Sequence, residues 1–415
     1  MKLLYRVFFW ILPGILKVLS LFSGKIRHFL TGRRTLFQDL ENFRRDHPGK
    51  LVWIHVASLG EYEQARPILA RWKAEFPEYF VLVSFFSPSG YDHVIKKPQP
   101  HVDFITYLPL DQKSNAIQFV QIIQPTFALF VKYDLWFEHI NALKKAGIPI
   151  FLVAAAFREN QIYFKVYGSF FKSILHKLDW IFTQNSETVQ LLNASGIYQT
   201  TQTGDTRFDR VAATAAAPKD LPEIKKWIDG RPTIVVGSAW EEDMALLIPL
   251  INSHPAYCWI IAPHDLDVKP MDRWASQIQQ ESVRYSLWDS NFAGSVLFID
   301  NIGMLSSLYQ FAKVGYVGGA FGKGLHNILE ALGFGIPVIF GKVKKPGKFP
   351  EAAQSVAEGC GFSISDFPEL ETTFLQLEQP DFYQQSAKSA QNWVKSNLGA
   401  ADKIVEAIRT KIQNP

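Results

Sequence analysis

Short apolar segments, separated by longer amphipathic stretches, recur along most of the 415-residue chain. Helical patterns lie between them, as at residues 63–76 and 115–123. Continuous apolar strands that alternate with helices are typical of a parallel sheet covered by helices on both faces. The pattern therefore predicts two doubly wound, Rossmann-like α/β domains, one in each half of the chain. The expected strands are residues 51–58, 79–85, 102–108, 126–132, 149–155 and 179–184, then 232–238, 257–263, 295–300, 313–319, 336–341 and 361–365.

The alternation breaks at residues 211–231, which are rich in alanine and charge and contain two prolines. We interpret this stretch as an interdomain linker with a short helix. It separates an N-terminal domain at 31–210 from a C-terminal domain at 232–415, whose last part, about 380–412, has a helical pattern. Two such domains are expected to face a central cleft. Ligands of open α/β sheets bind at the carboxyl ends of the strands, so the loops there should carry the chemistry.

The first 30 residues are predicted to be a membrane anchor. Residues 8–22 are nearly all apolar, interrupted by Lys17 and the Pro13–Gly14 pair. A spanning helix needs about 20 apolar residues, so a spanning helix and an interfacial helix both stay open. No small-residue cleavage site follows, which disfavours a cleaved signal peptide. The basic residues around the run would meet anionic lipid heads. These residues are Lys2, Arg6, Lys25, Arg27, Arg33 and Arg34.

Composition and missing motifs narrow the function classes. The chain is 47% hydrophobic and 20% charged, which is typical of a globular protein. Its net charge of +4 is spread out beyond the N-terminus, unlike the basic stripe of a nucleic-acid binder. Cys258 and Cys360 have no zinc-spaced partners and are expected to be buried thiols. No phosphate-binding P-loop occurs and no Gly-x-Gly-x-x-Gly follows either first strand, which disfavours a nucleotide hydrolase and a dehydrogenase. No HExxH motif occurs and YDLW (133–136) is not an Asp-x-Asp metal motif, so metal-independent chemistry is the simpler case.

The sequence HVASLGE (55–61) joins the first strand to the next helix. Gly60 is expected to adopt a positive φ or to permit a close backbone approach. Glu61 then lies at the helix start, where its carboxylate can accept a proton from an attacking hydroxyl. A carboxylate that only complements the helix dipole is the alternative, and spacing alone favours it.

A glycine-rich loop follows a strand of the second domain. Gly318, Gly319, Gly322 and Gly324 precede HNILEAL, which is expected to start a helix. Backbone N–H groups and the helix N-terminus would form a phosphate site, with Glu330 accepting from ribose hydroxyls.

Three further loops carry weaker signals. Pro263 and His264 follow a strand and are candidates for a base or phosphate pocket. Gly303 lies at a turn before a helix, with Asp300 as a candidate cap. Residues 237–242 follow the first strand of the second domain and are also expected near the ligand.

These loops, in their order and spacing, resemble the 3-deoxy-D-manno-octulosonic acid (Kdo) transferases almost end to end. That family has the GT-B fold and an N-terminal anchor at the cytoplasmic side of the inner membrane. The matching segments are HVASLGE, YLPLD (107–111), KYDLW (132–136), GDTRFD (204–209), IIAPH (260–264), IDNIG (299–303) and the glycine-rich loop with HNILEAL.

The resemblance implies a transfer of Kdo from CMP-Kdo to the glucosamine disaccharide of a lipid A precursor. No cofactor or metal is implied, and the partners are the donor, the lipid acceptor and the membrane surface. Glu61 corresponds to the family's catalytic base. The segments that contact the cytidine monophosphate correspond to Pro263 and His264, to Ile302, Gly303 and Met304, and to Asn327, Ile328, Leu329 and Glu330.

Two departures from the family pattern motivate alternatives. Pro263-His264-Asp265 replaces Pro-Arg-His, and Gly303-Met304-Leu305 replaces Gly-Glu-Leu. One alternative is a GT-B transferase that uses another nucleotide sugar. The other is a catalytically retired homologue that serves as a membrane scaffold.

Overall fold

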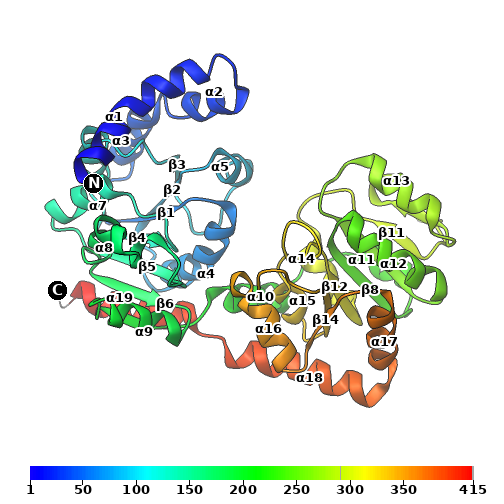
Figure 1. Cartoon of the computed structure of the whole chain (residues 1–415). Helices are drawn as coiled ribbons and strands as arrows, with labels where there is room; N and C mark the ends of the chain where they lie inside the picture. The colour runs from blue at the N-terminus through cyan, green and yellow to red at the C-terminus, as the bar shows by residue number, and fades with distance from the viewer. Residues whose placement is uncertain (290, 414–415) are drawn as a thin grey trace. The chain divides into compact units, whose positions relative to one another are not determined.

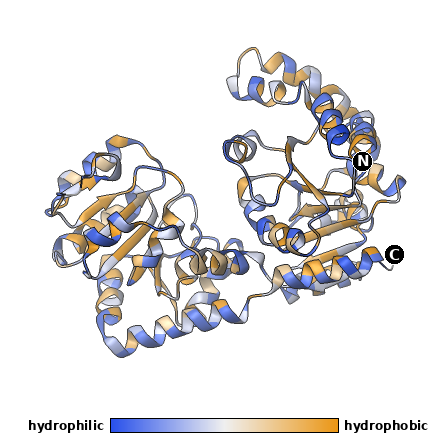
Figure 2. Cartoon of the chain, turned by 180° about the vertical axis from the view of Figure 1, so that it is seen from behind, coloured by the Kyte–Doolittle hydropathy of each residue, from blue (hydrophilic) through white to orange (hydrophobic). Residues whose placement is uncertain are grey.

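The chain forms two compact units in this computed structural model, which describes residues 1–289 and 291–413 (Figure 1). The first unit contains Met1–Arg210 and the C-terminal segment that begins at Leu398. The second unit extends from Val211 to Asn397. Each unit has one parallel sheet with helices around it, and its strands are the most apolar part of the ribbon (Figure 2). The prediction of two doubly wound α/β domains is therefore confirmed.

The sheet of the first unit has seven strands in the order β3-β2-β1-β4-β5-β6-β7. Each predicted strand of this half is present within two residues of its expected ends. The sequence missed β7, because it has only three residues and none is buried. The strands are β1 (Leu51–Val56), β2 (Phe80–Phe85), β3 (Phe104–Tyr107), β4 (Phe127–Val131), β5 (Ile150–Ala155), β6 (Trp180–Thr183) and β7 (Thr200–Gln202).

Alternate residues of β1 pack into two different cores, as the two-residue period of a strand requires. Leu51 and Trp53 belong to the core under α3, α6, α7 and α8, while Val52 and Ile54 belong to the core under α4 and α19. The helices are α1 (Lys2–Leu19), α2 (Gly24–Thr31), α3 (Leu36–Asp46), α4 (Leu59–Glu75), α5 (Pro88–Val94), α6 (Lys113–Ile123), α7 (Phe137–Lys145), α8 (Ser169–Leu175), α9 (Ser186–Ala194) and α19 (Ala400–Gln413).

The second unit repeats this design with the strand order β10-β11-β9-β8-β12-β13-β14. The unpredicted strand is β10, again only three residues long and half-buried. The strands are β8 (Thr233–Ala239), β9 (Cys258–Pro263), β10 (Ser282–Arg284), β11 (Val296–Phe298), β12 (Val314–Val317), β13 (Val338–Gly341) and β14 (Gly361–Ile364).

Cys258 and Cys360 are buried free thiols whose burial raises their pKa to about 11 and about 12.

Helices also fill the segment that was predicted as a linker. Residues 211–231 contain the end of α10 and the whole of α11, so the boundary between the units falls inside a helix. The helices of this half are α10 (Thr206–Ala216), α11 (Pro222–Ile228), α12 (Glu241–Ser253), α13 (Val268–Gln277), α14 (Leu305–Leu308), α15 (Leu329–Leu332), α16 (Pro350–Ala357), α17 (Phe367–Glu378) and α18 (Pro380–Ser396).

The C-terminal helix α19 packs in the first unit, although residues 232–415 were expected to form one domain. Ile404 and Ile408 are fully buried in the core under α4. Asp209 accepts hydrogen bonds from the backbone N–H groups of Gly399 and Ala401, at 2.7 and 2.8 Å. A helical pattern in the sequence shows which face is apolar but not which core receives it.

Within residues 1–289 and 291–413, no helix is long and apolar enough to cross a membrane. The predicted anchor at residues 1–30 instead contains α1 and α2, which lie on the first unit. Many apolar side chains of α1 and of the turn after it face solvent, among them Trp10 at 77% and Phe22 at 84% exposure. The structure therefore does not support a membrane-spanning anchor. It does place many apolar side chains of this segment in contact with solvent.

Candidate active site

Glu61 lies in the first turn of α4, immediately after the loop that leaves β1. Its Oε2 atom accepts a hydrogen bond of 2.5 Å from the backbone N–H of Ala57. Burial raises the pKa of the Glu61 carboxyl, and the charge of Asp134 raises it further, against the opposing effects of Ala57, Lys132 and His55. A half-buried carboxylate with a raised pKa is a better proton acceptor near neutral pH than an ordinary glutamate.

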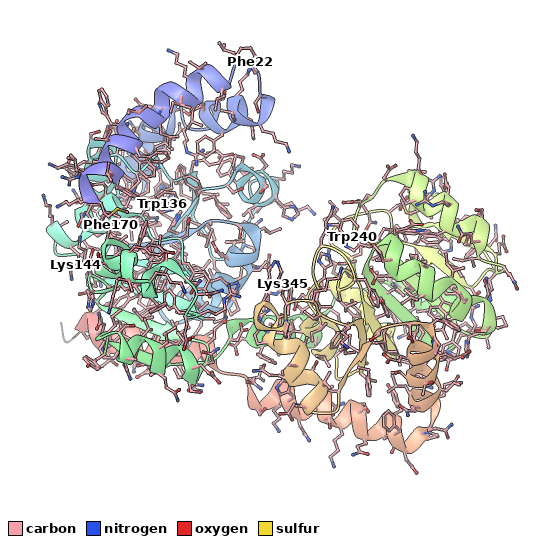
Figure 3. The ribbon with its side chains drawn as sticks, in the orientation of Figure 1. Phe22, Trp136, Lys144, Phe170, Trp240 and Lys345 are labelled. Atoms are coloured by element: carbon pink, nitrogen blue, oxygen red, sulfur yellow. The ribbon has the colours of Figure 1, made fainter. Side chains whose placement is uncertain are left out.

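A buried histidine fixes the second carboxylate beside Glu61. The Nε2 atom of His55, in β1, lies 2.7 Å from Oδ2 of Asp134, which follows the adjacent strand β4. The indole N–H of Trp136, a side chain labelled in Figure 3, is 3.1 Å from the same oxygen. The other ring nitrogen of His55 lies 2.9 Å from the hydroxyl of Ser84, in β2. Three neighbouring strands therefore hold Asp134 rigidly at their carboxyl end.

The backbone after β4 turns sharply to place Asp134. Lys132 has a φ of +60°, a left-handed conformation that is uncommon for a residue with a side chain. Such conformations occur where the surrounding structure imposes them, often at functional sites. The segment KYDLW was singled out only through the family resemblance. Its connection to His55 depends on β1 and β4 being neighbours, which sequence periodicity does not reveal.

Gly60 does not have the expected role. It has helical geometry within α4, and a Cβ atom there would meet nothing within 4 Å. Neither a positive φ nor a close backbone approach explains why residue 60 is a glycine.

The second unit presents three stacked rings after adjacent strands. Trp240 follows β8, His264 follows β9, and His326 lies in the loop after β12. The rings of Trp240 and His264 are 4.3 Å apart, and those of His264 and His326 are 4.5 Å apart. Burial, helped by the charge of His264, lowers the pKa of His326 to about 4. His326 is thus neutral at pH 7 and its Nε2 accepts a 3.3 Å hydrogen bond from the Trp240 indole.

The glycine-rich loop is shaped mainly by internal contacts. The buried carboxylate of Asp243 accepts from the N–H of Gly319 at 2.9 Å. A Cβ atom at Gly318 would lie 2.5 Å from that carboxylate, and Gly319 has a φ of +95°. The expected helix from HNILEAL is shorter than predicted, because α15 begins only at Leu329 and has four residues. The Gly319 amide is committed to Asp243, and no long helix N-terminus follows the loop.

The other predicted donor residues follow β11 and β12, which are consecutive in the chain but separated by β9 and β8 in the sheet. Gly303 has a φ of +93°, and its carbonyl accepts from the Lys219 ammonium. Asn327 donates to Glu330 at 3.2 Å and accepts from the N–H of Leu329. The side chains of Met304, Ile328 and Leu329 are buried, so these residues can contact a ligand only through their backbone. The Ile302 side chain, in contrast, is 71% exposed.

Asp300 does not cap the helix that follows it. Its carboxylate instead accepts from the backbone N–H of Ser286 at 3.0 Å. The short helix α14 has Met304 at its N-cap, with no side-chain hydrogen bond.

A basic segment after β13 was missed by the sequence analysis. It contains Lys342, Lys344, Lys345 and Lys348, all exposed. Phe349 is the next residue, and its ring lies against Gly324, because a Cβ atom added to Gly324 would be only 2.9 Å from that ring. The basic segment therefore adjoins the glycine-rich loop. Lys323 of that loop lies 4.2 Å from the Trp240 ring centroid. The sequence did contain a signal for this segment, namely several lysines close together after a predicted strand.

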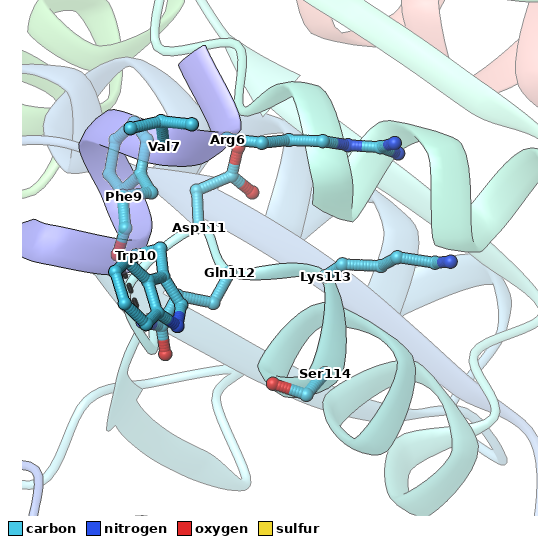
Figure 4. A pocket seen from close by; sticks show the side chains of 8 residues that line it. All are labelled: Arg6, Val7, Phe9, Trp10, Asp111, Gln112, Lys113 and Ser114. Atoms are coloured by element: carbon cyan, nitrogen blue, oxygen red, sulfur yellow. Dashed lines mark hydrogen bonds between the residues drawn. The ribbon is translucent and has the colours of Figure 1, made fainter. Parts of the chain in front are cut away.

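A buried polar cluster attaches α1 to the first unit. Asp111 accepts hydrogen bonds from the Tyr5 hydroxyl at 2.6 Å, from the His139 ring at 2.6 Å and from the N–H groups of Glu138 and His139. Arg6 donates to Glu138 at 2.6 Å. A cavity of about 570 Å³ opens beside this cluster, between α1 and residues 111–114 (Figure 4).

Within residues 1–289 and 291–413, no group of three or more His, Cys, Asp or Glu side chains is placed to hold a metal ion. The chemistry that these residues offer is proton transfer by Glu61 and binding through stacked rings and lysines.

Comparison with known proteins finds similarity to one family. Residues 32–210 match the family model of 3-deoxy-D-manno-octulosonic-acid transferase (kdotransferase). The 3-deoxy-D-manno-octulosonic acid transferase of Rickettsia felis is 24% identical over 374 residues, 86% of this chain and 78% of that protein. The enzyme of the same name from Aquifex aeolicus is 27% identical, over 79% of this chain and 85% of its own. The UDP-GlcNAc 2-epimerase of Neisseria meningitidis shares the fold, with a TM-score of 0.63 at 17% identity, over 87% and 100% of the two chains.

Proposed function

We propose that the chain is a member of the family of 3-deoxy-D-manno-octulosonic acid transferases, and that it transfers Kdo from CMP-Kdo to the glucosamine disaccharide of a lipid A precursor. The observation that carries the proposal is Glu61 itself. Its carboxylate is held by the Ala57 N–H beside Asp134, and burial raises its pKa. These are the properties of a general base matched to a hydroxyl nucleophile.

The proposed reaction is a displacement at the anomeric carbon of Kdo. Glu61 takes the proton of an acceptor hydroxyl, whose oxygen then bonds to the anomeric carbon. The bond from that carbon to the phosphate oxygen breaks, and CMP leaves with the electron pair. A transition state with oxocarbenium character is expected, as in glycoside hydrolysis. Asp134, held by His55 and Trp136, acts on Glu61 through its charge and is a positioning residue.

We assign the donor to the second unit. Pro263 and His264, residues 302–304 and residues 327–330 are the proposed contacts for CMP. The stack of Trp240, His264 and His326 supports a place for the cytosine ring, because aromatic faces bind bases. The donor carries a phosphate and a carboxylate, so the exposed lysines of 342–348 offer complementary charge. Neutralising the leaving phosphate is expected to contribute strongly to the rate.

We place the enzyme at the cytoplasmic face of the inner membrane, on a lipid acceptor. The exposed apolar side chains of α1 support an interfacial position, together with Lys17, Lys25 and Arg27. In Figure 4, Arg6 and Lys113 extend from the α1 cavity on the same side. Flotation with anionic vesicles is expected to recover the wild type and to lose the Trp10→Ser, Phe22→Ser double variant. Equal recovery of both would contradict this position.

The decisive experiment measures transfer by the wild type and by Glu61→Gln, with CMP-Kdo generated in situ and a lipid A precursor as acceptor. Glu61→Gln is expected to lose roughly 10²- to 10⁴-fold in rate while CMP binding is unchanged. Glu63→Gln on the same helix is the matched control, because its partners are Arg66 and Arg210. Full activity of Glu61→Gln would reject Glu61 as the base.

The same preparation separates the two alternatives. If the wild type transfers no Kdo but another nucleoside monophosphate raises its melting temperature, it is a transferase for a different nucleotide sugar. If no nucleotide raises the melting temperature, the scaffold alternative holds.

A further inference from the structure

An apolar groove lies between the N-terminal helices and the loop after β2. Six apolar side chains line it, from α1, α2, the loop after β2 and the loop after β3, and we call it the acyl groove. They are Leu12, Leu16, Ile26, Phe29, Phe86 and Leu110. The groove has a volume of about 670 Å³, within the range of small-molecule sites. Most of its lining is only half-buried, so these side chains contact water when the groove is empty.

The walls of the acyl groove are fixed by a half-buried cation and a polar pair. Arg33 donates to the carbonyl oxygens of Phe29 and Phe86, at 2.9 and 2.7 Å, and its guanidinium lies 3.7 Å from the Phe29 ring centroid. His28 of α2 lies 2.8 Å from the carboxylate of Asp92, in α5. These contacts join α2 to the loop after β2 and to α5. The groove is thus a pre-formed feature of the first unit.

Hydrogen bonds and ring contacts link the acyl groove to Glu61 and Asp134. Phe86 and Ser87 donate their N–H groups to the carbonyls of Val56 and Ala57, at 3.2 and 3.1 Å. Ala57 is the residue whose N–H holds the Glu61 carboxylate. The Phe86 ring also packs against Trp136, with centroids 4.4 Å apart, and Trp136 donates to Asp134. One wall of the groove is therefore in direct contact with the residues that position the catalytic base.

We propose that the acyl groove binds one acyl chain of the lipid acceptor and so places the acceptor hydroxyl beside Glu61. The inference rests on the proposed function, in which the acceptor is a lipid. Lys25 also lines the groove, where an anionic headgroup would meet its positive charge, while His28 is paired with Asp92. The same helix α1 carries Leu12 and Leu16 toward the groove and Ile11 and Ile15 toward solvent, so an acyl chain can pass from the proposed membrane face into the groove.

The test compares a groove-filling variant with a control on the same helix. Leu16→Trp fills the groove, whereas Val18→Trp changes a side chain that is 58% exposed and does not line it. Transfer is measured with the acylated disaccharide and with the same disaccharide after deacylation. Leu16→Trp is expected to raise KM for the acylated acceptor about tenfold or more, since displacing two methylene groups from apolar contact has that effect. Its kcat/KM for the deacylated acceptor should stay at the wild-type value, and Val18→Trp should match the wild type with both.

A binding measurement separates failure of the groove from failure of the proposed function. A fluorescent fatty acid is expected to bind the wild type and Val18→Trp, and to bind Leu16→Trp and Ile26→Trp weakly. Transfer at equal efficiency to both acceptors, with no fatty-acid binding, would overturn the groove and leave the proposed function intact. Fatty-acid binding that Leu16→Trp abolishes, without transfer to either acceptor, would support an acyl site and overturn the transfer. Hydrogen exchange of the first unit, unchanged from the wild type, checks that each variant is folded.

Discussion

Removing the Asp111 carboxylate should destabilise the first unit more than most single substitutions. Asp111 is 1% exposed and accepts four hydrogen bonds, from Tyr5, from Glu138 and twice from His139. In Asp111→Ala, the backbone N–H groups of Glu138 and His139 stay buried at the start of α7 without this acceptor. Each such group costs roughly 1–3 kcal/mol, so the expected loss is about 4 kcal/mol. Loss of the Tyr5 contact would also loosen α1.

Hydrogen exchange followed by mass spectrometry reads the two units separately. A loss of about 4 kcal/mol corresponds to roughly 10³-fold faster exchange of the slowest amides in the first unit. Amides of the second unit should not change, and Tyr5→Phe, which removes one of the four hydrogen bonds, should give a smaller effect. A change below tenfold in Asp111→Ala would refute the reasoning.

The same cluster predicts a pH dependence. Burial acts to raise the pKa of Asp111, but hydrogen bonds and charge from His139, with Tyr5 and the Glu138 amide, outweigh it and hold the pKa below the ordinary 3.8. A carboxyl with a lowered folded-state pKa adds stability above its ordinary pKa and loses it as the pH falls through the folded value. The difference between the wild type and Asp111→Ala should therefore be full at pH 7 and shrink below the ordinary pKa of an aspartate. A difference that stays constant into strong acid would contradict an ionised Asp111.

Three further predictions concern the site. In Asp134→Asn, the acid limb of the pH–rate profile should move to lower pH, because the Asp134 charge raises the pKa of Glu61 and the base must be ionised; an unmoved limb would mean that the two carboxyls do not interact. Trp240→Ala should weaken CMP binding in calorimetry by about tenfold, as for the loss of one stacked base, and unchanged affinity would place the cytosine elsewhere. Gly319→Ala should lower the melting temperature, because the φ of Gly319 is +95° and the added Cβ atom would lie 2.5 Å from the Gly324 carbonyl oxygen. Gly60→Ala should be neutral or stabilising by about 0.5–1 kcal/mol, because Gly60 is helical and its added Cβ atom would meet nothing within 4 Å.

Burial decided which strands could be predicted from the sequence. The interior strands β1, β4, β5, β8 and β9 are almost wholly buried and appear as continuous apolar runs. The edge strands β7 and β10 have three residues each and little burial, so they leave no such signal. The membership of α19 in the first unit was also hidden, because its anchoring by Asp209 joins residues 190 positions apart.

In the candidate site too, features formed by consecutive residues could be predicted, whereas contacts between distant residues could not. The place of Glu61 in the first turn of a helix could be predicted because a strand, a turn and a helix start are consecutive in the sequence, whereas its role as a base came only from the family resemblance. Its partners His55 and Asp134 are 79 positions apart and meet only because β1 and β4 are neighbours in the sheet. Similarly, the Trp240, His264 and His326 rings come from three different loops, and although each loop gave a local signal, none showed that the rings meet.

The glycine-rich loop shows why a motif and its chemistry can separate. Glycines after a strand suggested free amides for a phosphate, yet Asp243 occupies the Gly319 amide, and Gly318 leaves room for that carboxylate. An aspartate buried at this point would repel an anion that approached the same amides. The positive charge near the loop comes instead from side chains, Lys323 over the Trp240 ring and the lysines of residues 342–348. The glycines therefore serve to fold the loop tightly around Asp243, and in the proposed function the stacked rings and the lysines, not the glycine amides, would recognise the acidic nucleotide sugar.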